Sequence, residues 1–255
     1  SNEEAFELSC EKRVDLGGRL MLPGFVDSHL HMLHYAFVEK SVKLFDCQSV
    51  EEILGRVKER IEKRTEKPLT WLFCRGWNEE LFEVSRYPHK DELDAICNDI
   101  PIILVRVCGH MAVCNSLGLE RLKQIKEFSE IEAYVDMETG VLRENAVQFY
   151  YSVLEAPSQE EIEDYILHGV QKMNECGFTG IQSDDLASLP GKKWRRIMDA
   201  FQSLDAKGLM NLRVYEQCLF ERIEDAKAFI NEGFRTGQKG EFFTIGPMKL
   251  LQDGS

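Results

Sequence analysis

The chain has 255 residues, of which 44% are hydrophobic and 29% are charged, enough to build one large domain or two small ones. Its net charge of −13 disfavours nucleic acid as a partner, and no basic run offers a patch for an anionic membrane. The first ten residues do not resemble a secretory signal. Eight scattered cysteines without C-x-x-C spacing favour reduced thiols in a cytoplasmic protein over a zinc ribbon.

The first half of the chain contains two short apolar runs among helical patterns. A strand is predicted over residues 24–31. The capping box of Ser49 and Glu52 then begins a helix that is expected to end near residue 64. The apolar runs at 70–77 and 101–108 predict strands, with a helix between them over 88–97. Residues 109–157 give a less regular pattern, with a helix start near Arg143 and a turn at "METG".

The second half alternates regularly between helices and strands. A capping box of Ser158 and Glu161 begins a helix that ends near Gly177. Strands are predicted over 178–185, 211–219 and 242–254, with a helix in each gap. Such alternation predicts βαβ units and a parallel sheet, so the fold class is α/β.

The spacing of the strands suggests how the sheet is assembled. Gaps between the later strands are about thirty residues, whereas the gap from 31 to 178 is far longer. We therefore predict an inserted α/β lobe over residues 33–157. The remaining strands should be neighbours in one parallel sheet with right-handed connections. They are the segments 25–31, 178–184, 211–217 and 245–251.

Two histidines lie two residues apart in "LPGFVDSHLHML", residues 22–33. On a strand, His29 and His31 project to the same face, where two imidazoles could bind zinc or a similar divalent metal. Asp27 shares that face and could orient an imidazole from behind. The alternative is a pair of polar residues at a strand end, and the spacing alone does not separate the two.

The motif and several later segments resemble the amidohydrolase superfamily, and within it the amidohydrolase 3 (YtcJ-like) group, which includes N-substituted formamide deformylases. The resemblance implies a (β/α)8 TIM-like barrel, one or two divalent metals such as Zn²⁺, and hydrolysis of a C–N bond in a small amide or formamide. After "LPGFVDSHLHM", the similar segments are "RGWNEELF", "LDAICNDIPIILVRVCGHMAVCNSLGL", "TGVLRENA", "CGFTGIQSDD" and "MKLLQDGS".

The resemblance also implies a further metal ligand on the fourth barrel strand, where a lysine is often carboxylated and bridges two metals. When the inserted lobe is left out of the count, Lys249 falls on that strand. Its apolar flanks predict burial, and burial would favour the neutral amine that carbamate formation needs. The alternative is a lysine whose amine reaches solvent.

Several other side chains could complete the site. His110 could bind or polarise the substrate, or could be a hydrogen-bonded histidine at a strand end. Trp77 could line a pocket, although a core position is the more ordinary role. Glu144 could reach the metal site, or could lie in the first turn of a helix. His34 could be an extra metal ligand or a loop residue. Asp184 and Asp185 are polar residues at the end of a strand, where barrel enzymes keep their site residues. Asn115 is expected to cap a helix.

The pattern of the family is incomplete in this chain. Members of the family continue through four more strand-helix units, which supply two further histidines and a general base. Residues 1–32 and 158–255 are therefore expected to form the first half of a barrel, whose open edges favour a homo-oligomer. Metal binding and hydrolysis by this chain alone should be weak or absent. The rival hypothesis is a non-catalytic half-barrel that associates without metal.

Overall fold

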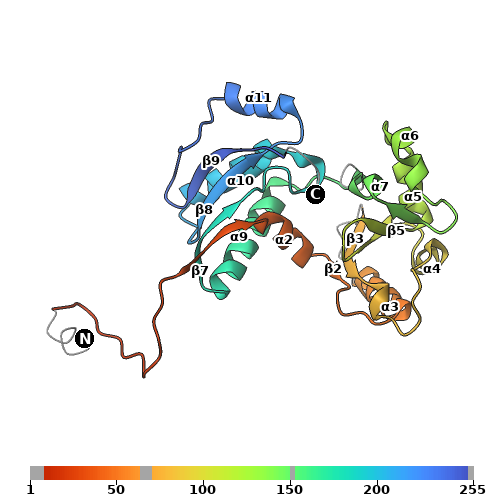
Figure 1. Cartoon of the computed structure of the whole chain (residues 1–255), viewed down its shortest axis with the longest axis horizontal. Helices are drawn as coiled ribbons and strands as arrows, with labels where there is room; N and C mark the ends of the chain where they lie inside the picture. Colours follow the sequence, from red (N-terminus) through yellow and green to blue (C-terminus); the bar gives the residue numbers. More distant parts are fainter. Residues whose placement is uncertain (1–8, 64–70, 150–152, 252–255) are drawn as a thin grey trace.

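The structure, a computed structural model, is described for residues 9–63, 71–149 and 153–251. Its strands form two sheets, one of four strands and one of five. The two sheets lie in separate parts of the molecule, and the exposed segment 9–24 runs away from both (Figure 1). Some predicted ends, at residue 64, residue 70 and residues 252–254, lie outside the described residues.

The four-stranded sheet is entirely parallel, with the order β1-β7-β8-β9. This confirms the predicted neighbourhood of the four strands, because neither of the apolar runs from the long gap intervenes between β1 and β7. Within the described chain β1 and β9 are the two edges of the sheet. The strands are β1 (Phe25–Leu30), β7 (Phe178–Ser183), β8 (Arg213–Leu219) and β9 (Phe243–Lys249).

Helices cover one face of this sheet (Figure 1). They are α9 (Gln159–Glu175) and α10 (Trp194–Ala206), and α11 (Ile223–Asn231) follows β8. The apolar stripe of α10 packs on the sheet, where the ring of Phe201 stacks on Phe243 with centroids 4.8 Å apart. A short 3-10 helix, η3 (Pro190–Lys192), precedes α10. The fold of this part is therefore α/β, with parallel strands connected by crossover helices.

The predicted capping box at the start of α9 is present. The Ser158 hydroxyl accepts the Glu161 backbone N–H at 3.2 Å, and the Glu161 carboxylate accepts the Ser158 N–H at 2.8 Å. We expect Ser158→Ala to lower the free energy of unfolding by about 1 kcal/mol, measured by urea denaturation. Ser158→Thr, which keeps a hydroxyl, should lose less. Equal stability of the alanine variant and the wild type would contradict this role.

The five-stranded sheet is mixed, with the order β2-β3-β4-β5-β6. Strands β2, β3 and β4 are parallel to one another, whereas β5 is antiparallel to both of its neighbours, β4 and β6. The predicted strands at 70–77 and 101–108 correspond to β3 (Leu72–Trp77) and β4 (Ile102–Arg106). The other strands, which we did not predict, are β2 (Val42–Lys43), β5 (Met111–Cys114) and β6 (Val141–Arg143).

The helices of this second part flank the sheet on both sides. Two core clusters form, one on each face, and apolar residues of β3 and β4 alternate between them. The helices are α3 (Val50–Glu62), α4 (Lys90–Ile96), α5 (Ser116–Lys123), α6 (Phe128–Ile131) and α7 (Asn145–Gln148), with 3-10 turns η1 (Glu79–Leu81) and η2 (Glu132–Tyr134).

Asn115 is the predicted cap of α5 and does more than cap. Its side chain is fully buried, and its Oδ1 accepts the N–H groups of Gly118 and Ile102, both at 2.9 Å. Its Nδ2 donates to the carbonyls of Ile100, at 2.9 Å, and Cys97, at 3.2 Å. One amide thus ties the start of α5 to β4 and to the end of α4.

Helix α2 (Met32–Glu39) connects the two sheets. Its first residues, Met32 and Leu33, belong to the core of the four-stranded sheet, and the helix packs on α9. Phe37 packs against that core and also against a core of the five-stranded sheet. The division of the chain at residue 33 remains a prediction, and this packing associates the start of the proposed lobe with the first sheet.

The cysteines and helices add two observations. All eight cysteines are free, and five of them are buried: Cys47, Cys74, Cys97, Cys114 and Cys218. Within the described residues, no helix combines the length and the apolar composition that a membrane crossing requires.

Candidate functional site

Three charged side chains meet where the strands of the four-stranded sheet end. His31 follows β1, Asp184 follows β7 and Lys249 ends β9. The Asp184 side chain is 1% exposed; its Oδ1 pairs with His31 Nδ1 and its Oδ2 with Lys249 Nζ. Because parallel strands end at one edge of a sheet, residues more than 200 positions apart in the sequence come together here. The Lys249 amine points to the site rather than to bulk solvent.

Charge pairing controls protonation at this cluster. Burial raises the pKa of Asp184, but the hydrogen bonds from His31 and Lys249 outweigh burial and hold that pKa below its ordinary value. The hydrogen bond to Asp184 raises the pKa of His31, against an opposing effect of burial. The carboxylate is thus ionised at neutral pH, with the Lys249 ammonium on one oxygen and the His31 imidazole on the other.

His29, on β1, lies beside His31, which is the N-cap residue of α2, and both residues are exposed. The two rings are 5.2 Å apart between centroids and stand at 78° to each other. The Asp27 carboxylate accepts the backbone N–H of His29 at 2.9 Å. The predicted contact of Asp27 with an imidazole is therefore replaced by a backbone contact, because the carboxylate folds back on its own strand in an Asx turn.

His34 lies in the first turn of α2 and lines a cavity of about 370 Å³. Burial lowers the pKa of His34, and the nearby positive charge of Arg75 lowers it further. The cavity is lined by His31, His34, Asp184, Ala187, Ser188, Lys192 and Leu219. We did not predict Arg75 or Lys192 as site residues, and both come from segments that only the fold brings near the histidines.

A buried polar network lies under the site. Asp185 Oδ1 accepts the N–H of Leu33 at 2.9 Å, and Ser183 Oγ accepts the N–H of Met32 at 3.1 Å while donating to Asp185 Oδ2 at 2.6 Å. Glu216 Oε1 accepts the N–H of Asp185 at 2.6 Å. The network fixes the first turn of α2, and therefore the position of His31 at the start of that helix.

Burial sets the protonation of the two acids in this network. Asp185 is fully buried, which raises its pKa to about 6 despite the hydrogen bonds it accepts. Burial also raises the pKa of Glu216 well above its ordinary value, and Asp185 adds to that rise. Glu216 was not predicted, although a glutamate that alternates with Val214 and Cys218 on the buried face of β8 was a visible signal.

His110 and Glu144 lie together beside the five-stranded sheet, just before β5 and just after β6. His110 Nδ1 is 3.2 Å from Glu144 Oε2, and both side chains are more than half exposed. Glu144 immediately precedes α7, with a φ of 45°, and its side chain makes no capping bond. The neighbouring Gly109 lies against Arg75: a Cβ placed on this glycine would be 3.4 Å from the guanidinium.

Trp77 does not have the predicted place in a pocket wall. It is fully buried in a core of the five-stranded sheet, its indole N–H donates to the Leu104 carbonyl at 2.9 Å, and its ring packs against Tyr87. The large ring fills the space between β3 and the segment after η1, which leaves it no surface for a substrate.

The donor set for a metal is incomplete in the described part of the chain. There, no group of three or more His, Cys, Asp or Glu side chains is arranged to hold a metal ion. The two imidazoles are adjacent, but the predicted third ligand, Lys249, is held by Asp184 as an ion pair. Zinc requires about four ligands, so these residues by themselves do not fit a bound zinc ion.

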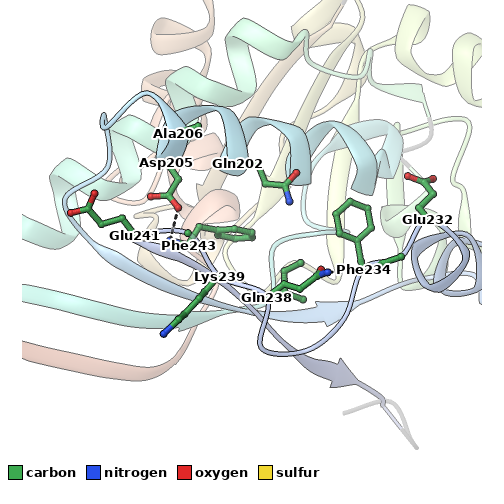
Figure 2. A pocket seen from close by; sticks show the side chains of 12 residues that line it. Gln202, Asp205, Ala206, Glu232, Phe234, Gln238, Lys239, Glu241 and Phe243 are labelled. Atoms are coloured by element: carbon green, nitrogen blue, oxygen red, sulfur yellow. Dashed lines mark hydrogen bonds between the residues drawn. The ribbon is translucent and has the colours of Figure 1, made fainter.

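A cavity of about 730 Å³ lies elsewhere in the molecule, between α10 and the segment that leads into β9. Figure 2 shows Asp205 on α10 bonded to the start of β9, where its carboxylate accepts the N–H of Phe243 at 3.3 Å. Phe243 begins β9 and Lys249 ends it, so the cavity belongs to the end of the sheet opposite the charged cluster. We therefore do not assign the candidate site to it.

The chain is similar to several known proteins. The inferred amidohydrolase YtcJ of Bacillus subtilis (strain 168) is 27% identical over 96% of this chain and 45% of its own length. The N-substituted formamide deformylase of Arthrobacter pascens is 30% identical over 42% of this chain and 20% of its own. The crystal structure of an uncharacterized metal-dependent hydrolase from Pyrococcus horikoshii OT3 matches with a TM-score of 0.70 at 24% identity, over 91% of this chain and 43% of that one.

Two of these matches extend over nearly the whole chain. The chain spans less than half the length of YtcJ and of the Pyrococcus protein, and the structural match supports the same α/β fold. The profile of the Amidohydrolase family matches residues 12–255, which include both sheets and the charged cluster at the ends of β1, β7 and β9. The chain belongs to the amidohydrolase family.

Proposed function

We propose that this chain forms part of a metal-dependent amidohydrolase that cleaves the C–N bond of an amide or formamide. The observation that carries the proposal is the convergence of His31 and Lys249 on buried Asp184. Active sites of parallel α/β sheets gather at the edge where the strands end. Family membership supports the reaction class, and the name of the Arthrobacter relative supports a formamide-type substrate.

The proposal assigns the metal site only in part. A bound divalent metal, with zinc as our first candidate, would polarise the amide carbonyl and acidify a water molecule. His29 and His31 would be two ligands, and Lys249 a third after carboxylation. Since the described residues do not complete such a site, the other ligands would come from further units like those of longer relatives. His110 and Glu144 remain candidates for contacting the substrate, with His110 polarising it.

We further propose that the four-stranded sheet is the first half of a (β/α)8 barrel and that residues 33–157 are inserted in it. Four parallel strands in chain order with helices on one face support this. The edges β1 and β9 would then pair with further strands or with a second copy. The exposed apolar side chains of Phe25, Val26 and Met248 on these two strands are consistent with such pairing.

The test is metal binding by this chain, measured by zinc titration and by metal analysis after dialysis. We expect binding weaker than in a full-length relative and negligible turnover of N-formyl and N-acyl amines. The double variant His29→Ala/His31→Ala should remove the remaining zinc binding, because it removes both imidazoles. Lys249→Met should weaken it, whereas the matched control Lys58→Met, on an exposed face of α3, should not.

Two outcomes would contradict the proposal. Zinc binding that is indifferent to both histidines and to Lys249 would remove the metal role and favour the rival half-barrel that associates without metal. Robust zinc-dependent turnover by the 255-residue chain would show that no further unit is needed. Glu144 and His110 would then be the first candidates for completing the site.

A further inference from the structure

A second cavity lies on the same rim of the sheet as the charged cluster. Its volume is about 690 Å³, and it is lined by the segments that follow β7 and β8 together with Phe149 at the end of α7. Two acidic residues line it, Glu221 and Asp225. Its cationic lining residues are Lys192, Lys193, Arg195, Arg196 and Arg222. This excess of three positive charges occurs in a chain whose net charge is −13.

Internal pairing leaves part of this charge unneutralised. Lys192 pairs with Glu221, and Arg222 is bonded to Asp225 at 3.0 Å. Arg195 pairs with Asp199 and Glu232, which lie outside the cavity lining.

Two cations have no such partner. Arg196 donates to the carbonyl of Pro157 at 3.2 Å. Neither Arg196 nor Lys193 has a carboxylate oxygen within 4.0 Å among the residues that the structure describes. The hydrogen bond from Arg222 lowers the pKa of Asp225 in the same cavity lining, and the charge of Lys193 contributes to that lowering. Since this carboxylate is already bonded to Arg222, Lys193 and Arg196 keep positive charge that a bound anion could neutralise.

The start of α10 adds to the positive potential of the cavity. Lys193 is the residue before the helix, Arg196 lies in its first turn, and neither an acidic residue nor a side-chain cap is present there. The positive end of the helix dipole and these cations repel one another. A bound anion in the cavity would be attracted both to the helix dipole and to these cations. The helix dipole therefore adds to a positive potential that the cationic lining residues already produce.

Lys192 connects the cavity with the candidate site. It lines this cavity and also the 370 Å³ cavity that contains His31 and Asp184. Its backbone is fixed in a left-handed conformation with a φ of 45°, after Gly191. That glycine lies so close to Ala156 that an added Cβ would be 2.5 Å from the Ala156 Cβ. The segment between the two cavities is thus held in one shape by tight packing.

We propose that this cavity binds the phosphate or carboxylate group of a small molecule through Lys193, Arg196 and the start of α10. As a statement about substrate it rests on the proposed function: the anionic group would lie here and the scissile amide would reach past Lys192 to His31. The substrate class is then an amide or formamide that carries an anionic substituent. Arginine and lysine side chains at a helix start suit both oxyanions.

Anion binding can be measured directly on this chain by isothermal titration calorimetry. The probes are inorganic phosphate and succinate, each compared with chloride at equal ionic strength, since unspecific charge effects depend on ionic strength alone. We expect a Kd of about 1 mM or below for at least one probe. Lys193→Gln/Arg196→Gln should weaken it about tenfold, and Lys193→Gln alone by a smaller factor.

The control variant is Lys58→Gln/Lys63→Gln, which removes the same charge from exposed positions at the end of α3. It should leave the Kd unchanged. Binding of phosphate without succinate would identify a phosphate site, and the reverse a carboxylate site. Equal affinity in the wild type and the Lys193→Gln variants, or no binding of either probe at about 20 mM, would overturn the proposal. Neither metal nor turnover is measured, so the proposed function stands or falls separately.

Discussion

The free energy of unfolding of the wild type should fall as pH rises from about 4 to about 6, and Asp185→Asn is expected to remove a large part of that fall. Burial raises the pKa of Asp185 in the folded chain to about 6, against an ordinary value of 3.8. The folded state therefore holds a proton that the unfolded state has released, and stability falls as pH rises through this window. The difference of about two pKa units corresponds to about 3 kcal/mol.

Asparagine preserves the geometry of the network while removing the titration. Its oxygen can accept the Leu33 N–H and its amide can donate to Ser183, the two contacts of Asp185. Urea denaturation at pH 4.5 and pH 8 should give similar stability at the lower pH and a more stable variant at the higher one. Asp199→Asn, on the exposed face of α10, is the control. Parallel profiles for wild type and Asp185→Asn would refute the assignment.

Replacing Asn115 with alanine is expected to lower the free energy of unfolding by about 4 kcal/mol, because four buried backbone groups lose their partners together. These are the N–H groups of Ile102 and Gly118 and the carbonyls of Cys97 and Ile100. The fully buried position of Asn115 leaves no access for water to replace them. Urea denaturation at constant pH measures the loss.

Asn115→Asp keeps the two bonds that the side chain accepts and removes the two that it donates. Aspartate still accepts both N–H groups but places a carboxylate against two carbonyl oxygens, so it should also be destabilising. Ser158→Ala, with its smaller expected loss, is the reference for a cap at the surface. A loss below about 1 kcal/mol for Asn115→Ala would show that the surrounding backbone can find other partners.

The parallel sheet could be predicted because its signal is local. Each of its later strands lies about thirty residues from the next, and the capping box of Ser158 marks a helix between them. The five-stranded sheet was predicted less completely: β5 and β6 are three or four residues long, too short for a periodic pattern. Helix α2 was missed because its first turn is stabilised by Ser183 and Asp185, side chains about 150 positions away.

In the candidate site, too, residues with a local sequence signal were predicted and those that depend on distant contacts were not. His29, His31 and Lys249 were predicted from a motif and a count of strands, and the fold brings Lys249 and His31 to one carboxylate. Asp184 was noted only as a polar strand end, since no local pattern reveals that its two oxygens meet two distant cations. Trp77 has the core position that was the more ordinary of its two expected roles, and the pocket-wall alternative is wrong because its ring is fully buried. Arg75 contributes through tertiary contact alone.

The pairing of β1 with β7 has a consequence for the order of folding. The two strands are separated by the whole segment from residue 31 to residue 177, and forming their contacts requires closing a chain loop of that length. If the five-stranded sheet is already folded, its compact body shortens the distance that the open chain must bridge. Contacts between distant parts of a chain slow folding. We therefore expect the pairing of β1 with β7, and with it the cluster of His31, Asp184 and Lys249, to form after the local contacts within each sheet.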